Sequence, residues 1–130
     1  MDVILDTCGF LSLTGLAEKN LSPDVLRVIE EAPSVYVSAG SLFEMAIKHK
    51  KGSISLRPFE NALALWNTAI EEYRMTELPV TANVFFASTV LDDIHSDPFD
   101  RIIIAEAKSR DLTVVTFDML FPRYGVSTMY

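Results

Sequence analysis

Short runs of β-branched residues alternate with longer amphipathic stretches along this chain, and that alternation strongly constrains the fold. Strands are predicted at residues 3–5, 35–37, 77–80, 112–116 and 126–128, and helices fill most of the intervals between them. No repeat, low-complexity tract or linker interrupts the pattern. Strands that alternate with helices form βα units, so the sequence predicts an α/β fold with a mostly parallel sheet.

Local capping signals fix the expected helix boundaries. Side chains that accept hydrogen bonds from backbone N–H groups are expected as N-caps at Ser22, Ser38 or Ser41, Thr81 and Asp97. A first helix is expected over residues 9–16, and Pro58 is expected to start a long helix that runs through Ile70. The basic residues 48–51, followed by Gly52, predict the end of the helix that Ser38 or Ser41 begins.

The composition indicates a single globular domain spanning residues 1–130. Apolar residues make up 49% of the chain, which supports a substantial core. No apolar run reaches the ~20 residues of a membrane span, and Asp2 stands where a signal peptide has basic residues. A cytoplasmic protein with no membrane association is therefore expected. Cys8, the single cysteine, excludes an internal disulfide and is predicted to be a small buried apolar residue.

The formal net charge of −7 argues against a plain nucleic-acid-binding module, because such modules contact phosphates through Lys and Arg. It does not exclude a nuclease, since acids gathered around a metal ion increase the negative count without repelling substrate once the metal is bound. A partner protein with a basic segment would also suit this surface.

Four acids are expected to meet at one edge of the predicted sheet. Asp6 and Asp118 follow strands, while Glu44 and Asp100 lie near the starts of helices. Ligands of open parallel sheets bind beyond the carboxyl ends of the strands. Two unit charges about 4 Å apart repel by roughly 4 kcal/mol at an effective dielectric of about 20, so such a cluster favours a cation inside it. Carboxylate oxygens select Mg²⁺ or Mn²⁺, which suit phosphodiester chemistry.

Each of these acids also has an ordinary structural interpretation, and spacing alone leaves both open. Asp6 could cap the helix that begins near Thr7, and Glu44 could lie on a solvated helix face. Asp100 could interact with the helix dipole, and Asp118 could form an Asx turn. Their shared position at one sheet end is what favours a metal site.

Four segments, residues 4–7, 41–48, 95–107 and 114–118, together resemble PIN-domain proteins, and more narrowly the VapC-type toxins of bacterial toxin–antitoxin pairs. The stretch His95-Ser96-Asp97-Pro98-Phe99-Asp100-Arg101 is the most specific part of the match. The resemblance implies an α/β/α sandwich with a central parallel sheet. It also implies a Mg²⁺- or Mn²⁺-dependent ribonuclease that leaves 5′-phosphate and 3′-hydroxyl products, is often a homodimer and is held inactive by an antitoxin.

The resemblance also assigns roles by motif position. Asp6 and Asp100 are implied as direct metal ligands, Asp118 as a direct or water-mediated ligand, and Glu44 as a ligand or as the group that orients the attacking water. Thr7 and Thr116 occupy positions where hydroxyl residues support the site. Asp97 and Arg101 belong to the same motif and are interpreted as a helix cap and a helix-stabilising ion pair.

One basic cluster could contact RNA phosphates, namely Lys48, Lys50, Lys51 and Arg57. Helix C-capping explains the same residues equally well. The competing class is a PIN fold that has lost activity and only binds a protein partner. A receiver domain or a haloacid-dehalogenase-like phosphatase would need another acid close after the first strand, where Cys8 stands. No glycine-rich nucleotide-binding loop is present.

Overall fold

The computed structural model describes all residues 1–130, and its centre is a five-stranded parallel sheet. The strands are β1 (Val3–Leu5), β2 (Val35–Ser38), β3 (Thr76–Leu78), β4 (Thr113–Val115) and β5 (Thr128–Met129). Their order across the sheet is β3-β2-β1-β4-β5, so the first strand of the chain is the central one. In register, Leu5 lies between Val37 of β2 and Val115 of β4, which aligns the carboxyl ends of these three strands.

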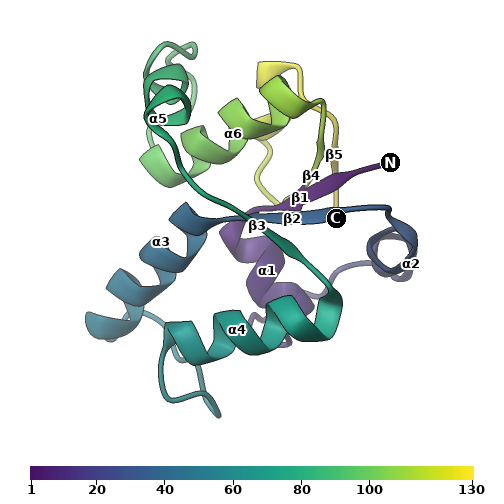
Figure 1. The fold of residues 1–130 in the computed structure, drawn as a ribbon, viewed down its shortest axis with the longest axis vertical. Coiled ribbons are helices and arrows are strands. Elements are labelled where there is room, and N and C mark those ends of the chain that lie inside the picture. The colour runs from purple at the N-terminus through teal and green to yellow at the C-terminus, as the bar shows by residue number, and fades with distance from the viewer.

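Helices cover both faces of the sheet, as Figure 1 shows. They are α1 (Thr7–Leu13), α2 (Pro23–Glu31), α3 (Ala39–Lys50), α4 (Ala62–Tyr73), α5 (Ala82–Thr89) and α6 (Pro98–Arg110), with a 3₁₀ turn at Phe121–Tyr124. The core on one face combines strand residues with side chains from the first four helices, and the core on the other face combines them with α6 and the 3₁₀ turn. The predicted α/β/α sandwich is therefore confirmed.

β1 shows why the strands of this sheet are continuous hydrophobic runs in the sequence. Val3 and Leu5 contribute to one core, and Ile4, between them, contributes to the other. All three residues are fully buried, because helices cover both faces of a parallel sheet. No helix is both long and apolar enough to span a membrane.

Three of the predicted N-caps are confirmed. Ser22, Thr81 and Asp97 each accept a backbone N–H bond from the first turn of α2, α5 and α6 respectively. Of the two candidates for α3, Ser38 is the cap, because its hydroxyl accepts from the N–H of Gly40. The helix ends at Lys50, with Lys51 as its C-cap directly before the predicted stop at Gly52.

Three local predictions are wrong. Pro58 does not start α4, which begins at Ala62, because the side chain of Asn61 accepts the N–H of Ala64 and provides the cap. Cys8 is exposed rather than buried, because it lies in the first turn of α1 on the side away from the core. The first helix also begins earlier than expected, at Thr7, directly after Asp6.

Candidate metal centre

Asp6 directly follows the central strand, and both of its carboxylate oxygens are fixed. Oδ1 accepts the N–H of Gly9 at 2.6 Å, so Asp6 is the N-cap of α1. Oδ2 accepts the hydroxyl of Thr116 at 2.5 Å. The residue is only 3% exposed, and this burial raises its pKa from the usual 3.8 to about 6 despite both hydrogen bonds. Its role as N-cap accounts for the position of Oδ1. It does not account for a carboxylate whose charged form is disfavoured by burial.

Glu44 faces the interior of the site rather than solvent. It lies on α3 and is 5% exposed. Its Oε1 accepts the hydroxyl of Thr7 at 2.6 Å, and its Oε2 pairs with Lys48 Nζ at 2.6 Å. Thr7 Oγ1 also lies 3.0 Å from Ser41 Oγ. The hydrogen bond to Glu44 is the main reason that the pKa of Lys48 is raised. The interpretation of Glu44 as a solvated residue is therefore wrong.

Asp100 lies in the first turn of α6, three residues after the Asp97 cap. Burial, together with the negative charges of Asp97 and Asp6, raises its pKa to about 7, while His95 acts in the opposite direction. A carboxylate in this position favours binding a cation, because a cation would offset both the desolvation and the repulsion.

Asp118 follows β4 and is held by backbone contacts. Its Oδ1 accepts the N–H of Leu120 at 2.9 Å, which is the Asx turn considered from the sequence. Its own N–H donates to Thr116 Oγ1 at 2.9 Å. Thr116 therefore links two of the acids, because the same hydroxyl donates to Asp6. This is a physical basis for the supporting position expected of Thr116.

The four acids lie close enough to influence one another. The charges of Asp118 and Glu44 both raise the pKa of Asp6, and those of Asp6 and Glu44 both raise that of Asp100. Lys48 and His95 are the basic side chains in contact with these acids. A set of hard carboxylate oxygens with excess negative charge fits Mg²⁺ or Mn²⁺. The residues that could hold such an ion are Asp6, Asp100, Asp118 and Glu44.

Two residues of the site were missed or misread from the sequence. His95 Nε2 lies 3.0 Å from Asp100 Oδ2 and 2.8 Å from Asp118 Oδ2, although no role was expected for it. Arg101 forms no ion pair; its guanidinium instead donates to four backbone carbonyls, those of Ser88, Leu91, Asp92 and His95. The sequence signal that could have identified His95 is its position two residues before the Asp97 cap, which places it close to the start of the helix that carries Asp100.

A groove beside the acids contains part of the basic cluster. It has a volume of about 520 Å³ and is lined by Glu44, Ile47, Lys48, Lys51, Ser53, Asp97, Pro98 and Phe99. Lys48 and Lys51 line this groove, whereas Lys50 does not. Lys48 also pairs with Glu44, so of the three lysines only Lys51 lines the groove without a carboxylate partner.

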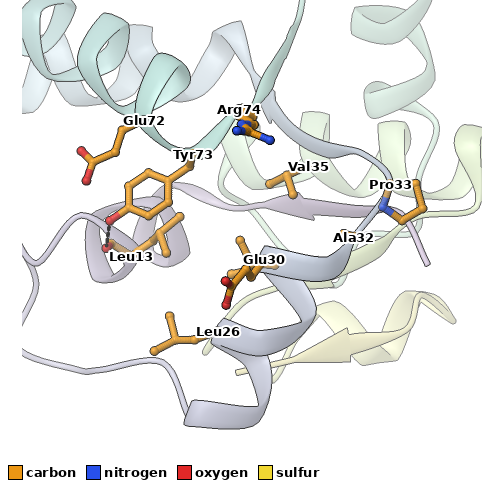
Figure 2. A pocket seen from close by; sticks show the side chains of 10 residues that line it. Leu13, Leu26, Glu30, Ala32, Pro33, Val35, Glu72, Tyr73 and Arg74 are labelled. Carbon is orange, nitrogen blue, oxygen red and sulfur yellow. Dashed lines mark hydrogen bonds between the residues drawn. The ribbon is translucent and has the colours of Figure 1, made fainter.

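A larger cavity lies at the other end of the sheet and contains none of the predicted site residues. It has a volume of about 780 Å³ and lies where α1, α2 and α4 surround the start of β2, as Figure 2 shows. Tyr73 donates its hydroxyl to the carbonyl of Leu13 across this region, at 3.2 Å. Because none of the four acids lines this cavity, it is not expected to take part in chemistry at the acid cluster.

Cys8 is near the acids but is poorly suited to act as a nucleophile. Although the residue is exposed, neighbouring atoms partly desolvate its sulfur, and this desolvation, followed by the charges of Asp6, Asp100 and Glu44, raises the pKa of the thiol to about 11. A thiol with such a pKa carries almost no thiolate at neutral pH. The acids are therefore the reactive groups to consider at this sheet edge.

Comparisons with known proteins agree with the fold described above. VapBC2 from Rickettsia felis, bound to a DNA fragment from its promoter, has 17% identity and a TM-score of 0.69 over 98% of this chain and 97% of that chain. DNA-bound VapBC from Salmonella typhimurium has 23% identity and a TM-score of 0.69 over 98% and 96%. FitAcB from Neisseria gonorrhoeae has 19% identity and a TM-score of 0.64 over 100% and 97%. At such low identities, the TM-scores show a shared fold and nothing more. No curated protein matches the sequence.

The PIN domain profile matches residues 3–126, a range that runs from before the first acid of the cluster, Asp6, to beyond the last, Asp118. The match covers nearly the whole chain, so this protein belongs to the PIN domain family.

Proposed function

We propose that this chain is a single-domain, Mg²⁺- or Mn²⁺-dependent endoribonuclease and the toxin of a toxin–antitoxin pair. The observation that supports the proposal is a set of four buried or half-buried acids from four separate elements, whose charges raise the pKa values of Asp6 and Asp100. Repulsion at this density is unfavourable without a cation, so the cluster is best explained by metal binding.

Each residue then has a definite task. Asp6 and Asp100 would hold the ion, Asp118 would hold it directly or through water, and Glu44 would hold it or orient the attacking water. A bound divalent ion supplies positive charge that lowers the pKa of water and stabilises the phosphate oxygens. Thr116 keeps Asp6 in place by donating to Oδ2, and Thr7 does the same for Glu44 at Oε1. Hydrolysis by this route would leave a 5′-phosphate and a 3′-hydroxyl.

The biological setting is also part of the proposal. The fold matches chains in solved VapBC and FitAcB structures over almost their full length. By analogy, the partner would be a cognate antitoxin, and the active form would be a homodimer that acts on cytoplasmic RNA. A net charge of −7 suits a partner that presents basic side chains.

Metal removal and replacement of Asp100 test the activity directly. RNA should be cut in the presence of Mg²⁺ or Mn²⁺, remain intact after chelation with EDTA, and be cut again when the ion is restored. Asp100→Asn should lose the activity because it removes one charged oxygen from the cluster. Asp24→Asn is the matched control, since Asp24 is an exposed first-turn acid of α2 that pairs only with Arg27. Equal cleavage by the Asp100 variant and the wild type would refute the assignment.

The alternative is a PIN fold that only binds a partner. It predicts no cleavage of any RNA under any metal condition, together with unchanged partner binding in the Asp100→Asn variant. Size-exclusion chromatography with the candidate antitoxin, run beside the cleavage assay, separates the two functions. The presence of all four acids in one place favours the enzyme.

Lys51→Ala should weaken RNA binding by a few-fold and reduce its salt dependence. Each phosphate contact to single-stranded nucleic acid contributes about 0.7 to the slope of log K against log salt concentration. Loss of the Lys51 contact should therefore lower the slope by about that amount. Lys50→Ala is the control, because Lys50 belongs to the same helix but does not line the groove. Binding to a short RNA in EDTA, measured by fluorescence anisotropy, gives both slopes. Identical slopes for the two variants would rule out the groove as the RNA path.

A further inference from the structure

The imidazole of His95 lies between two of the proposed metal ligands. Its Nε2 is 3.0 Å from Asp100 Oδ2 and 2.8 Å from Asp118 Oδ2, and its side chain is 10% exposed. One ligand atom from each of these residues lies within 4.8 Å of the other two, a spacing compatible with a shared cation. A nitrogen ligand would change the metal preference of the site toward transition metals. The bonding of the other ring nitrogen decides whether His95 can be that ligand.

That other nitrogen is already used. The backbone N–H of Asp97 donates to His95 Nδ1 at 3.1 Å. An N–H donor needs a lone pair on its acceptor, so Nδ1 carries no proton. The ring proton is therefore on Nε2, which is hydrogen-bonded to Asp118 Oδ2 and lies 3.0 Å from Asp100 Oδ2. A nitrogen that bears a proton has no lone pair with which to bind a metal or to accept a proton from water.

We propose that His95 is a positioning residue, which uses one Nε2–H to hold Asp100 and Asp118 together and does not itself bind the metal. This inference rests on the proposed metal-dependent function, and it makes the ligand set entirely oxygen. Hydrogen bonds to ligating carboxylates fix their orientation, and losing such a bond typically lowers metal affinity 10- to 100-fold. The imidazole would act in this way on two ligands at once.

The surroundings of His95 fix the ring in this orientation. Its backbone N–H donates to the hydroxyl of Tyr124 at 2.7 Å, and its carbonyl accepts from Arg101 at 3.0 Å. The ring packs edge-on against Phe121, with centroids 5.9 Å apart and planes at 87°. Arg101 and Tyr124 also bind the carbonyl of Asp92, so the segment that leads into α6 is anchored as a unit. The most specific stretch of the sequence therefore combines an anchor, a cap, a ligand and a positioning group.

Two spectroscopic measurements test the inference without relying on activity. In metal-free protein, ¹⁵N NMR of the imidazole should show His95 as the tautomer protonated at Nε2. In Mn²⁺-loaded protein, electron spin-echo spectroscopy should show no directly coordinated ¹⁴N. A proton on Nδ1, or a nitrogen coupling that disappears in a His95 variant, would overturn the proposal.

A pair of substitutions separates the two nitrogens of the ring. In His95→Gln the side-chain amide can reach the position of Nε2 and donate, whereas in His95→Asn the shorter side chain can replace only the acceptor at Nδ1. We expect Mn²⁺ affinity to fall about tenfold or more in the Asn variant and to stay within a few-fold of wild type in the Gln variant. Equal losses in two variants of equal thermal stability would contradict the positioning role.

The outcome for His95 can be separated from that for the proposed function. If the chain binds Mn²⁺ with these properties but cuts no RNA, the positioning role stands and the nuclease assignment fails. If RNA is cut while the Asn variant binds Mn²⁺ as tightly as wild type, the nuclease stands and the role of His95 fails.

Discussion

Asp6→Asn should reduce RNA cleavage roughly a hundredfold or more while making the metal-free protein more stable above pH 7. The loss follows because Asp6 is a proposed direct ligand, and changes to groups that merely support a ligand already cost 10- to 100-fold. The gain follows because Asp6 is almost fully buried with a pKa raised to about 6, so its charge destabilises the folded state at neutral pH. Asparagine retains an Oδ1 that can accept the Gly9 N–H, so the helix cap survives the change.

The pH dependence of stability gives the sign of this effect. Asp6 titrates near 3.8 in the unfolded chain and near 6 in the folded protein, so between these values the folded state binds more protons. Stability of the metal-free protein should therefore fall as pH rises from about 4, and Asp100, with a pKa near 7, extends the fall to about pH 7. For Asp6 alone the full difference corresponds to roughly 3 kcal/mol, which is an upper bound on what Asn can recover.

Urea unfolding in EDTA at pH 5 and pH 8 measures the predicted difference. The wild type should be less stable at pH 8, and Asp6→Asn should show a smaller loss between the two pH values. Added Mg²⁺ should stabilise the wild type at pH 8 more than it stabilises the variant. A variant that is less stable than the wild type at pH 8, with an unchanged pH dependence, would show that the charge of Asp6 is not a source of instability.

Gly9→Ala should destabilise the fold by about 3 kcal/mol or more and weaken metal binding as well. A Cβ at Gly9 would lie 2.5 Å from the carbonyl oxygen of Val115 and 3.0 Å from Asp6 Oδ1. Overpacking usually costs about 1 to 3 kcal/mol, and here the obstacle is sheet backbone rather than a flexible side chain. The neighbouring strand or the first turn of α1 would have to move, and that movement would displace the Asp6 carboxylate.

Gly40→Ala is the matched control, since Gly40 also lies in the first turn of a helix that follows a strand. Its nearest neighbour to an added Cβ is the hydroxyl of Ser38, at 3.3 Å, and the next are methyl groups beyond 3.6 Å. Alanine there should be tolerated within about 1 kcal/mol, because its helix propensity offsets the small contact. Denaturation midpoints and Mn²⁺ titrations of both variants provide the comparison. Equal stability of the two would disprove the steric role of Gly9.

Features whose cause lies within a few residues could be predicted from the sequence. Ser22, Thr81 and Asp97 were identified as caps because an N-cap bonds to the next turn of its own helix. The prediction that Pro58 starts a helix was wrong because Pro also occurs in turns. The capping signal was carried by Asn61, three residues later. The set of four acids was predictable only as a shared sheet edge, from the rule that parallel strands align their carboxyl ends.

Features that depend on contacts distant in the sequence were not predictable. The burial of Glu44 depends on Thr7, which is 37 residues away, and the role of His95 depends on Asp118, which is 23 residues away. The charge of Arg101 predicts an ion pair, because a charge can be identified from the sequence. The backbone carbonyls that Arg101 binds cannot be identified in this way. Backbone acceptors leave no mark in the residue types, so such anchors emerge only with the fold.

The central place of the first strand has a consequence for how the protein is made. Thr116, which holds Asp6 Oδ2, lies 110 residues after it, so Asp6 leaves the ribosome well before its partner, and β4 must insert beside β1 before the two can meet. Until those residues have been made, a nascent chain carries an incomplete set of acids and a β1 strand whose edge toward β4 is unpaired. If the chain is the nuclease proposed above, its set of acids is complete only once translation has passed Asp118, so the proposed cleavage of RNA would have to wait until then.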